Sequence, residues 1–434
     1  MVPNKKSEIA PDQKAFPEIL DRMQWGCLIL FSVGCFVSIS LAQISALAGF
    51  LTWLMQLRIT RFWERIQIPV LLPIALFAGA SICSTIFSVD WQVSIKTLKK
   101  LFEILIFFWA INALRTIGSA PSFINRLFFF NNTKENPLSS NGENLVRLFT
   151  LWGVLAALYS FYEASLHGIQ LPHRVVGTFD NPISWGVILM MLSLLAFANL
   201  IYSSRKSRVL SGLLFSILVS CLIITLAREA WLGFTISISG MLFFRKPLLA
   251  VIAPLTFILI LVLLPHSIQE RLLAMTDFSQ QTLKLRIQMW QGGWEIFKDY
   301  PVIGCGYNCS SFVANDYRGY EKFLQTWAGG FHNNFVQIAV ELGSVGLLTW
   351  ISIWVVFFWL SILRLQALNE DHPDRWLIHG SIWAIAAFLI ACIFESHFYD
   401  TEVAMILFMI MALPFSITSD SKGVDEKNTL GYLL

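Results

Sequence analysis

Four stretches of the chain place charged or hydrogen-bonding side chains at the ends of apolar runs. They carry Arg174 with Asn181, then Arg228, then Arg286, and finally His332 with Asn333. A guanidinium stays charged and binds phosphate oxygens through two parallel N–H groups. A histidine can accept a proton near neutral pH. Three arginines and a histidine therefore suggest a site for a polyanion, such as a diphosphate, beside a general base.

The histidine lies in the stretch FHNNFVQIAVELGSVG, residues 331–346. Asn333 is a good helix N-cap, a short helix is predicted over 334–342, and Gly343 supplies its stop. The positive end of this helix and the nearby arginines both disfavour another positive charge. We therefore expect His332 to be neutral and able to accept a proton, although a lone histidine at a helix start is more often structural.

A polar stripe follows this histidine on the predicted helix. Asn333, Gln337 and Glu341 are spaced by four, so they share one helix face. An inert membrane helix would not need such a stripe. With Asn181, these residues are predicted to bind the substrate.

Composition defines the environment of the site. The chain has 434 residues, of which 56% are hydrophobic and 14% are charged, and its mean hydropathy is +0.63. A soluble domain has about 25% charged residues, so this chain could not cover itself with polar surface in water. We expect an all-α polytopic membrane protein surrounded by membrane lipids. The net charge of +3 is too small to suggest nucleic-acid binding.

Apolar runs predict about twelve transmembrane helices. The runs cover residues 24–40, 41–57, 68–87, 101–114, 148–166, 183–202, 209–227, 229–244, 247–264, 344–362, 376–394 and 403–418. The first two are nearly continuous, but a single helix over both would be about 50 Å long, well beyond the hydrocarbon thickness. They are therefore predicted to be separate.

Lysine and arginine placement predicts the orientation. With both termini inside, 20 of the 31 lysines and arginines lie inside, as the positive-inside rule expects. Nine spans with short loops then occupy residues 1–264. One large, mostly helical loop on the outer face covers 265–343 and should carry catalytic elements, and 344–434 hold three spans and an inner tail.

No metal or cofactor site is predicted. The chain lacks H-E-x-x-H, paired-aspartate and C-x-x-C motifs. Cys305 and Cys309 share the outer loop, but their spacing matches neither a zinc pattern nor a recognisable disulfide framework. Whether these two cysteines are bonded stays open at this stage.

Four motifs together resemble the O-antigen ligase and O-antigen polymerase superfamily over about residues 170–350. They are R-x-x-G-x-x-x-N-P from Arg174, LAREAWLG around Arg228, R-x-x-x-W from Arg286 followed by YPVIGCGY, and FHNNFVQIAVELGSVGL around His332. The last motif is the most specific. The family commonly has a serine before the second arginine, where this chain has Ala227.

The resemblance implies a GT-C-like, metal-independent, inverting glycosyltransferase of the bacterial inner membrane. Such an enzyme moves a glycan from undecaprenyl diphosphate onto an acceptor hydroxyl, such as that of lipid A-core, on the periplasmic side. Arg228 and Arg286 would hold the diphosphate with help from Arg174, and His332 would take the acceptor's proton. His173 is a rival base without a comparable helix.

Two alternatives to a ligase remain open. A polymerase of the same superfamily would extend the glycan on its carrier with the same motifs. An anion transporter could use the same arginines, but transporters usually show internal repeats and polar groups near mid-membrane. No repeat stands out here, and the polar groups gather at the outer face, so a transferase is favoured.

Overall fold

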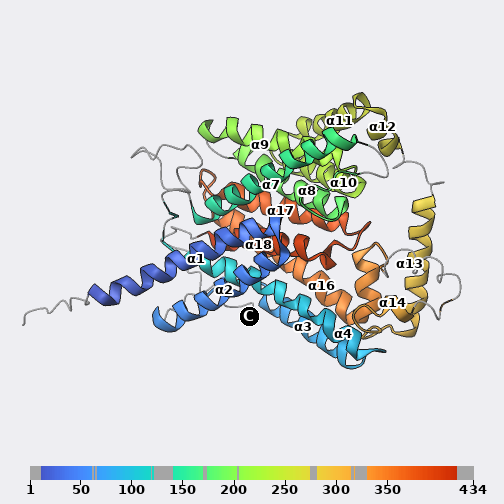
Figure 1. Cartoon of the computed structure of the whole chain (residues 1–434), viewed down its shortest axis with the longest axis horizontal. Coiled ribbons are helices and arrows are strands. Elements are labelled where there is room, and N and C mark those ends of the chain that lie inside the picture. Colours follow the sequence, from blue (N-terminus) through green and yellow to red (C-terminus); the bar gives the residue numbers. More distant parts are fainter. Residues whose placement is uncertain are drawn as a thin grey trace, which may run out of the picture.

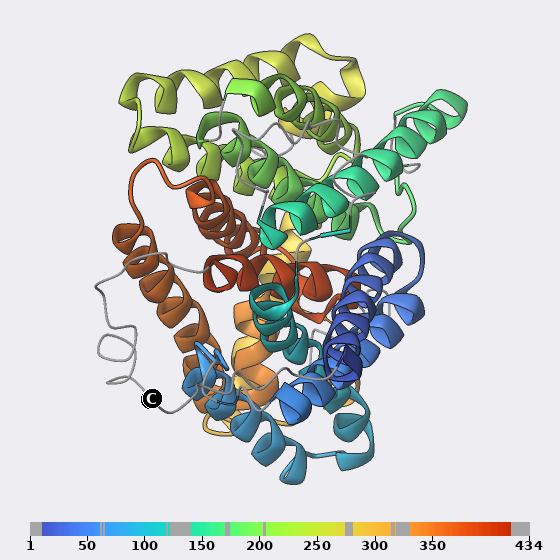
Figure 2. The same cartoon turned by 90° about the vertical axis from the view of Figure 1, so that its left-hand side faces the viewer.

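The computed structural model of this chain is helical in every regular element that it describes (Figures 1 and 2). It describes residues 11–60, 63, 66–118, 120–121, 140–169, 174–202, 205–273, 281–313, 317 and 330–417. Five of the helices are long and apolar enough to cross a membrane, and five shorter ones are also apolar. The chain is therefore a polytopic, all-α integral membrane protein, as predicted.

The helices follow the predicted apolar runs closely. In chain order they are α1 (Pro11–Val37), α2 (Ile39–Thr60), α3 (Leu71–Ile86), α4 (Trp91–Leu98), the 3₁₀ helix η2 (Lys99–Ile104), α5 (Leu105–Thr116), α7 (Asn141–His167), α8 (Pro182–Tyr202), α9 (Arg205–Ile224), α10 (Arg228–Phe243), α11 (Pro247–Leu263), α12 (His266–Leu273), α13 (Gln281–Asp299), α14 (Ser310–Val313), α16 (Asn334–Ala367), α17 (Arg375–Ala391), the 3₁₀ helix η4 (His397–Tyr399) and α18 (Thr401–Ser416). Every predicted run overlaps one of them, and the first two runs are separate helices divided at Ser38. The count of twelve crossings and the GT-C likeness stay predictions.

The helices form three groups around a buried centre (Figures 1 and 2). Helices α7 to α12 lie on one side, α1 to α5 on the other, and α16 to α18 between them. Helix α18 is the most enclosed, because every residue from 403 to 417 is buried. In contrast, α11 exposes apolar side chains such as Leu248, Leu255 and Leu263, which a hydrocarbon environment would cover. Helices α13 and α14 lie together at one end of the molecule (Figure 1).

Helix α16 is broken at the predicted place. Asn333 caps its start, since the Asn333 side chain accepts hydrogen bonds from the N–H groups of Phe335 and Val336. Gly343 then takes a left-handed conformation with φ 69°, which separates a short first helix from the long apolar one. This is the stop that the sequence predicted.

The segment 301–306 satisfies the backbone groups that this break frees. The N–H groups of Cys305 and Gly306 donate to the carbonyls of Val340 and Glu341, and those of Ser344 and Val345 donate to the carbonyls of Pro301 and Val302, at 2.8–3.2 Å. Unpaired backbone groups are costly in a membrane protein. The segment therefore splints the broken helix, and we call it the splint segment.

Two glycines allow this close approach of backbones. A Cβ at Gly343 would lie 2.2 Å from the Val302 oxygen, and one at Gly304 would lie 2.3 Å from the Glu341 oxygen. Both glycines also have positive φ. Beside them, Cys305 and Cys309 are joined in a disulfide, which answers the pairing question that the spacing alone left open.

Candidate active site

The backbone around His332 is held in an uncommon conformation. His332 itself has φ 47°, in the left-handed region that non-glycine residues rarely adopt. The preceding residue fixes it: the Phe331 N–H donates to Gln337 Oε1 at 2.9 Å, and Trp290 Nε1 donates to the Phe331 carbonyl at 3.0 Å. With the Asn333 cap directly after it, the histidine is positioned from both sides.

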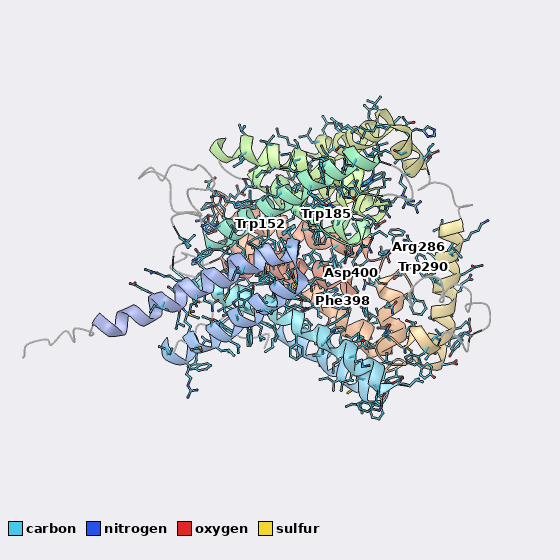
Figure 3. All side chains as sticks on the ribbon, in the orientation of Figure 1. Trp152, Trp185, Arg286, Trp290, Phe398 and Asp400 are labelled. Carbon is cyan, nitrogen blue, oxygen red and sulfur yellow. A yellow bond between two sulfur atoms is a disulfide. The ribbon has the colours of Figure 1, made fainter. Side chains whose placement is uncertain are left out.

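The His332 ring contacts a carboxylate that the sequence prediction did not include. Its Nδ1 is hydrogen-bonded to Glu395 Oε1, and Arg286 Nη2 donates to the other oxygen, Oε2, at 3.2 Å. The Glu395 side chain is 11% exposed, and those of Arg286 and His332 are 19% exposed. The three residues thus form a largely buried arginine–carboxylate–histidine chain. Figure 3 marks Arg286 and Trp290 on α13 and Asp400 in the loop after α17.

The loop after α17 is tied directly to the start of α16. The N–H of Asn334 donates to the Cys392 carbonyl at 2.8 Å, and the Phe398 N–H donates to Asn334 Oδ1 at 3.1 Å. These bonds flank Glu395 in the sequence. They explain why a residue 63 positions from His332 meets its ring.

The environment of Glu395 favours its charged form. Burial raises the pKa of this carboxyl, but the hydrogen bond from His332 and the charges of His332, Arg286 and His397 outweigh burial, so the net pKa lies below the ordinary glutamate value. Glu395 is therefore ionised at neutral pH. The prediction of a neutral His332 took account of the positive helix end and the nearby arginines. It did not include this neighbouring negative charge.

Two arginines converge on the turn that precedes α10. Arg174 Nε donates to the Thr225 carbonyl at 3.0 Å, and Arg271 Nε donates to the Leu226 carbonyl at 3.1 Å. Leu226 has φ 57°, so this turn also has an uncommon backbone. Arg228, the first residue of α10, follows directly and brings a third guanidinium to the same place.

Four guanidiniums share this region with few negative charges. Arg271 is within electrostatic range of Arg174, Arg228, Arg286 and Glu229; burial first, and then the neighbouring arginines, lower its pKa to about 10. Burial also lowers the pKa of Arg174, although Glu229 opposes the shift. Guanidinium groups stay charged at neutral pH, so the region concentrates positive charge that an anion would stabilise.

The predicted polar stripe is bonded mainly within the protein. Gln337 and Glu341 are 4% and 1% exposed and hydrogen-bonded to each other, and Glu341 also accepts from the Tyr399 hydroxyl at 2.8 Å. Asn181 is exposed, and its Oδ1 accepts from the Ile183 N–H at the start of α8. With the Asn333 cap, these four side chains support the architecture, and their contact with a substrate stays a prediction.

Sequence reasoning missed Glu395 and Arg271. Neither belongs to a local motif: Glu395 follows an apolar helix, and Arg271 is one of several basic residues in the outer loop. They are recognised as site candidates only from their contacts with residues far away in the sequence. The rival base His173 lies outside the described residues.

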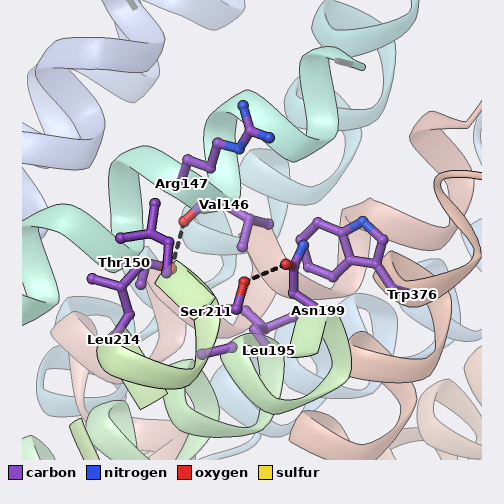
Figure 4. Close-up of a pocket in the computed structure, with 10 residues that line it drawn as sticks. Val146, Arg147, Thr150, Leu195, Asn199, Ser211, Leu214 and Trp376 are labelled. Atoms are coloured by element: carbon purple, nitrogen blue, oxygen red, sulfur yellow. Dashed lines mark hydrogen bonds between the residues drawn. The ribbon is translucent and has the colours of Figure 1, made fainter. Parts of the chain in front are cut away.

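Neither a metal site nor the main cavity coincides with the candidate site among the described residues. Among the described residues, no group of three or more histidine, cysteine, aspartate or glutamate side chains is arranged to hold a metal ion. A cavity of about 40 Å³ lies among α7, α8, α9 and α17 (Figure 4). It is lined largely by apolar side chains with Arg147, Asn199 and Ser211, and it contains none of the predicted site residues.

Comparison with known proteins agrees with the motifs. The family model described as O-antigen ligase matches residues 213–351. A segment of 103 residues is 31% identical to the "Exopolysaccharide production protein ExoQ" of Rhizobium meliloti (strain 1021). That alignment covers 23% of this chain and 23% of the relative. The matched family region contains Arg228, Arg271, Arg286 and His332, whereas Arg174 and Glu395 lie outside it.

Proposed function

We propose that this chain, whose residues 213–351 match the O-antigen ligase family model, is a membrane glycosyltransferase that moves a glycan from undecaprenyl diphosphate to an acceptor hydroxyl. The observation that carries the proposal is the arginine cluster beside the His332–Glu395 pair. A diphosphate needs concentrated positive charge, and a hydroxyl nucleophile needs a base. The chain brings both together, because Arg286 and His332 bond the same Glu395 carboxylate, and a lipid carrier suits a site built on membrane helices.

In the proposed reaction the acceptor oxygen attacks the anomeric carbon of the donor sugar. The bond between that carbon and the phosphate oxygen breaks, and its electron pair stays on the diphosphate. Arg228 and Arg286 stabilise this charge, with Arg174 assisting. The acceptor's proton passes to Nε2 of His332, because Nδ1 is bonded to Glu395. A single displacement of this kind inverts the anomeric configuration.

Glu395 has a supporting part in this mechanism. A carboxylate on Nδ1 holds an imidazole in one tautomer and one orientation, as the aspartate does in serine-protease triads. The Glu395 carboxylate also balances the positive charge on the ring after proton uptake. Arg286 bonds the same carboxylate, so it can orient Glu395 and contact the diphosphate from one position.

We place the reaction on the periplasmic face of the bacterial inner membrane, with both termini in the cytoplasm. The acceptor we favour is lipid A-core, which makes the enzyme a ligase. The second candidate is a polymerase, for which the acceptor is another carrier-linked glycan. The similarity to a protein named for exopolysaccharide production favours this candidate. The chemistry at His332 is the same in both.

Transfer by the purified full-length protein tests the proposal. We expect His332→Asn to lower kcat by roughly 10²–10⁴-fold, the range for a lost general base, while donor binding persists. Asparagine is chosen because it tolerates a left-handed backbone better than alanine does. His266→Asn is the matched control, since His266 is 81% exposed on α12.

The same assay separates the two candidates when lipid A-core and a second carrier-linked glycan are supplied in parallel. Product on lipid A-core identifies a ligase, and a lengthened carrier-linked glycan identifies a polymerase. Near-parental turnover by folded His332→Asn protein with either acceptor would show that His332 is not the base.

A further inference from the structure

We propose that Arg271 is a fourth carrier-binding residue, which contacts the lipid-side phosphate of the diphosphate and makes the site selective for two phosphates over one. This inference rests on the proposed function. It assigns a role to a residue that lies outside the four recognised motifs, and it divides the arginines between the two phosphates.

The geometry places Arg271 at the far end of the cluster from the base. Arg286 is bonded to Glu395 next to His332, so Arg286 lies where the sugar–phosphate bond must break. Arg271 is instead bonded to the Leu226 carbonyl, on the turn before α10. Among the charges around Arg271, Arg228 acts most strongly and Arg286 least.

The cluster therefore has a direction, from Arg286 through Arg228 to Arg271. Arg174 donates to the same two-residue turn as Arg271, but it is also within electrostatic range of Glu395 and Arg286, so it lies between the two ends. A diphosphate laid along this direction puts its sugar-bearing phosphate near His332. Its prenyl-bearing phosphate then lies near Arg271.

Charge counting supports the assignment. The four arginines carry four positive charges, and Glu229 and Glu395, the carboxylates within range of Arg271 or bonded to Arg286, carry two negative charges. The remaining two positive charges match a sugar–diphosphate–prenyl donor, in which each phosphate is substituted on both sides and keeps one ionised oxygen. Without Arg271 the site would have one positive charge too few to neutralise the two phosphates.

The match also holds through the reaction. When the sugar–phosphate bond breaks, the carrier gains one negative charge. At the same time His332 gains the acceptor's proton and one positive charge. The site with its ligand is thus neutral before and after transfer, and no uncompensated charge develops in a largely buried region.

The experiment measures binding of undecaprenyl diphosphate and of undecaprenyl phosphate to the full-length protein in lipid nanodiscs. We expect Arg271→Gln to weaken binding of the diphosphate by roughly 10–100-fold, as for the loss of one charge-assisted contact. Binding of the monophosphate should change by less than about threefold. Arg271→Lys keeps the charge without the planar fork, so its loss should be intermediate.

Glu270→Gln is the matched control, because Glu270 is the neighbouring residue on α12 and its side chain is 66% exposed. The control should bind both lipids like the parent. Thermal unfolding confirms that each variant is folded. If Arg271→Gln is not folded, the lipid binding of Arg271→Lys decides between the expected and the contradicting result.

Two results would overturn the assignment. Equal weakening for both lipids means that Arg271 only supports the turn before α10, and parental affinity for both means that it does not bind the carrier. In either case the parent still prefers the diphosphate, so the proposed function survives. If the parent itself shows no such preference, the proposed function fails together with this inference.

Discussion

His332 and Leu226, which flank the arginine cluster, both have a left-handed backbone. Such a conformation costs of order 1–3 kcal/mol at a non-glycine residue and persists only where surrounding contacts impose it. At His332 those contacts are the Trp290 and Gln337 hydrogen bonds to Phe331. The protein thus gives up some stability to orient the His332 ring. This is expected of a functional side chain more than of one that only packs.

The carboxylate partner gives a prediction at this scale. Glu395→Gln keeps the side-chain shape but removes the charge that contacts His332 and Arg286. We expect kcat to fall by roughly 10²-fold or more and stability at neutral pH to fall by about 1–3 kcal/mol. Glu295→Gln, which is 48% exposed on α13, is the control. Transfer assays and thermal unfolding measure the two effects.

The pH dependence of that stability difference has a definite sign. The folded-state pKa of Glu395 is depressed, so its contribution is fully present above the unfolded glutamate pKa of about 4.3. It is lost as the pH falls through the lower, folded value. The parent and Glu395→Gln should therefore converge in acid. A difference that instead grows below pH 4 would contradict the ionised assignment.

How far the sequence predicts the site depends on the residue. The candidates His332, Arg228, Arg286 and Arg174 lie in local motifs, so the sequence alone could propose them. Glu395 carries no local signal, since it reaches His332 only through the way α17 packs beside α16. Contacts of this kind arise from tertiary structure, which spacing along one chain does not encode.

At the scale of the element, α16 is the helix on which the site depends. Its first turns carry the Asn333 cap, and Gly343 separates them from the apolar remainder. The cap and the stop were predictable, because capping chemistry is local. The splint segment was not predictable, because its backbone hydrogen bonds to the break in α16 join residues about 40 apart in the sequence.

The break gives the next prediction. Gly343→Ala should destabilise the protein by more than about 1–2 kcal/mol, the cost of a left-handed residue with a Cβ, because the new methyl group would also collide with the Val302 carbonyl. Transfer should fall with it, since His332 directly precedes the Asn333 cap of the displaced helix. Thermal unfolding and the transfer assay check both effects.

Gly79→Ala is the matched control for that substitution. Gly79 lies within α3, and a Cβ there would meet no atom within 4 Å. Because alanine is the better helix former, this variant should be neutral or more stable by up to about 1 kcal/mol. A Gly343→Ala protein as stable as this control would mean that the splint does not constrain the break.

At the scale of the whole molecule, the sequence predicts the positions of the helices more strongly than their orientation in the membrane. Helix positions followed from apolar runs, since burial in lipid imposes a strong and continuous pattern. Orientation rests on a bias in lysine and arginine placement, which is a weaker signal. The Cys305–Cys309 disulfide supplies an independent test, because disulfides persist in oxidising compartments and not in the bacterial cytosol.

Thiol labelling of denatured protein from cells makes this test quantitative. Seven cysteines are present and five are free, so a mass-tagged alkylating reagent should add five tags before reduction and seven after it. Cys305→Ser/Cys309→Ser protein should take five in both cases. Seven tags on the unreduced parent would place the splint segment in the cytosol and contradict the proposed orientation.

The contact between Glu395 and His332 has a consequence for dividing the chain. The matched family region ends at residue 351. The Glu395 carboxylate that bonds the His332 ring lies beyond this limit, in the loop after α17. A fragment cut at the limits of that region would keep the histidine and lose its partner. The limits of the family match and the limits of the proposed site are therefore different in this protein, and only the proposed site reaches beyond α17.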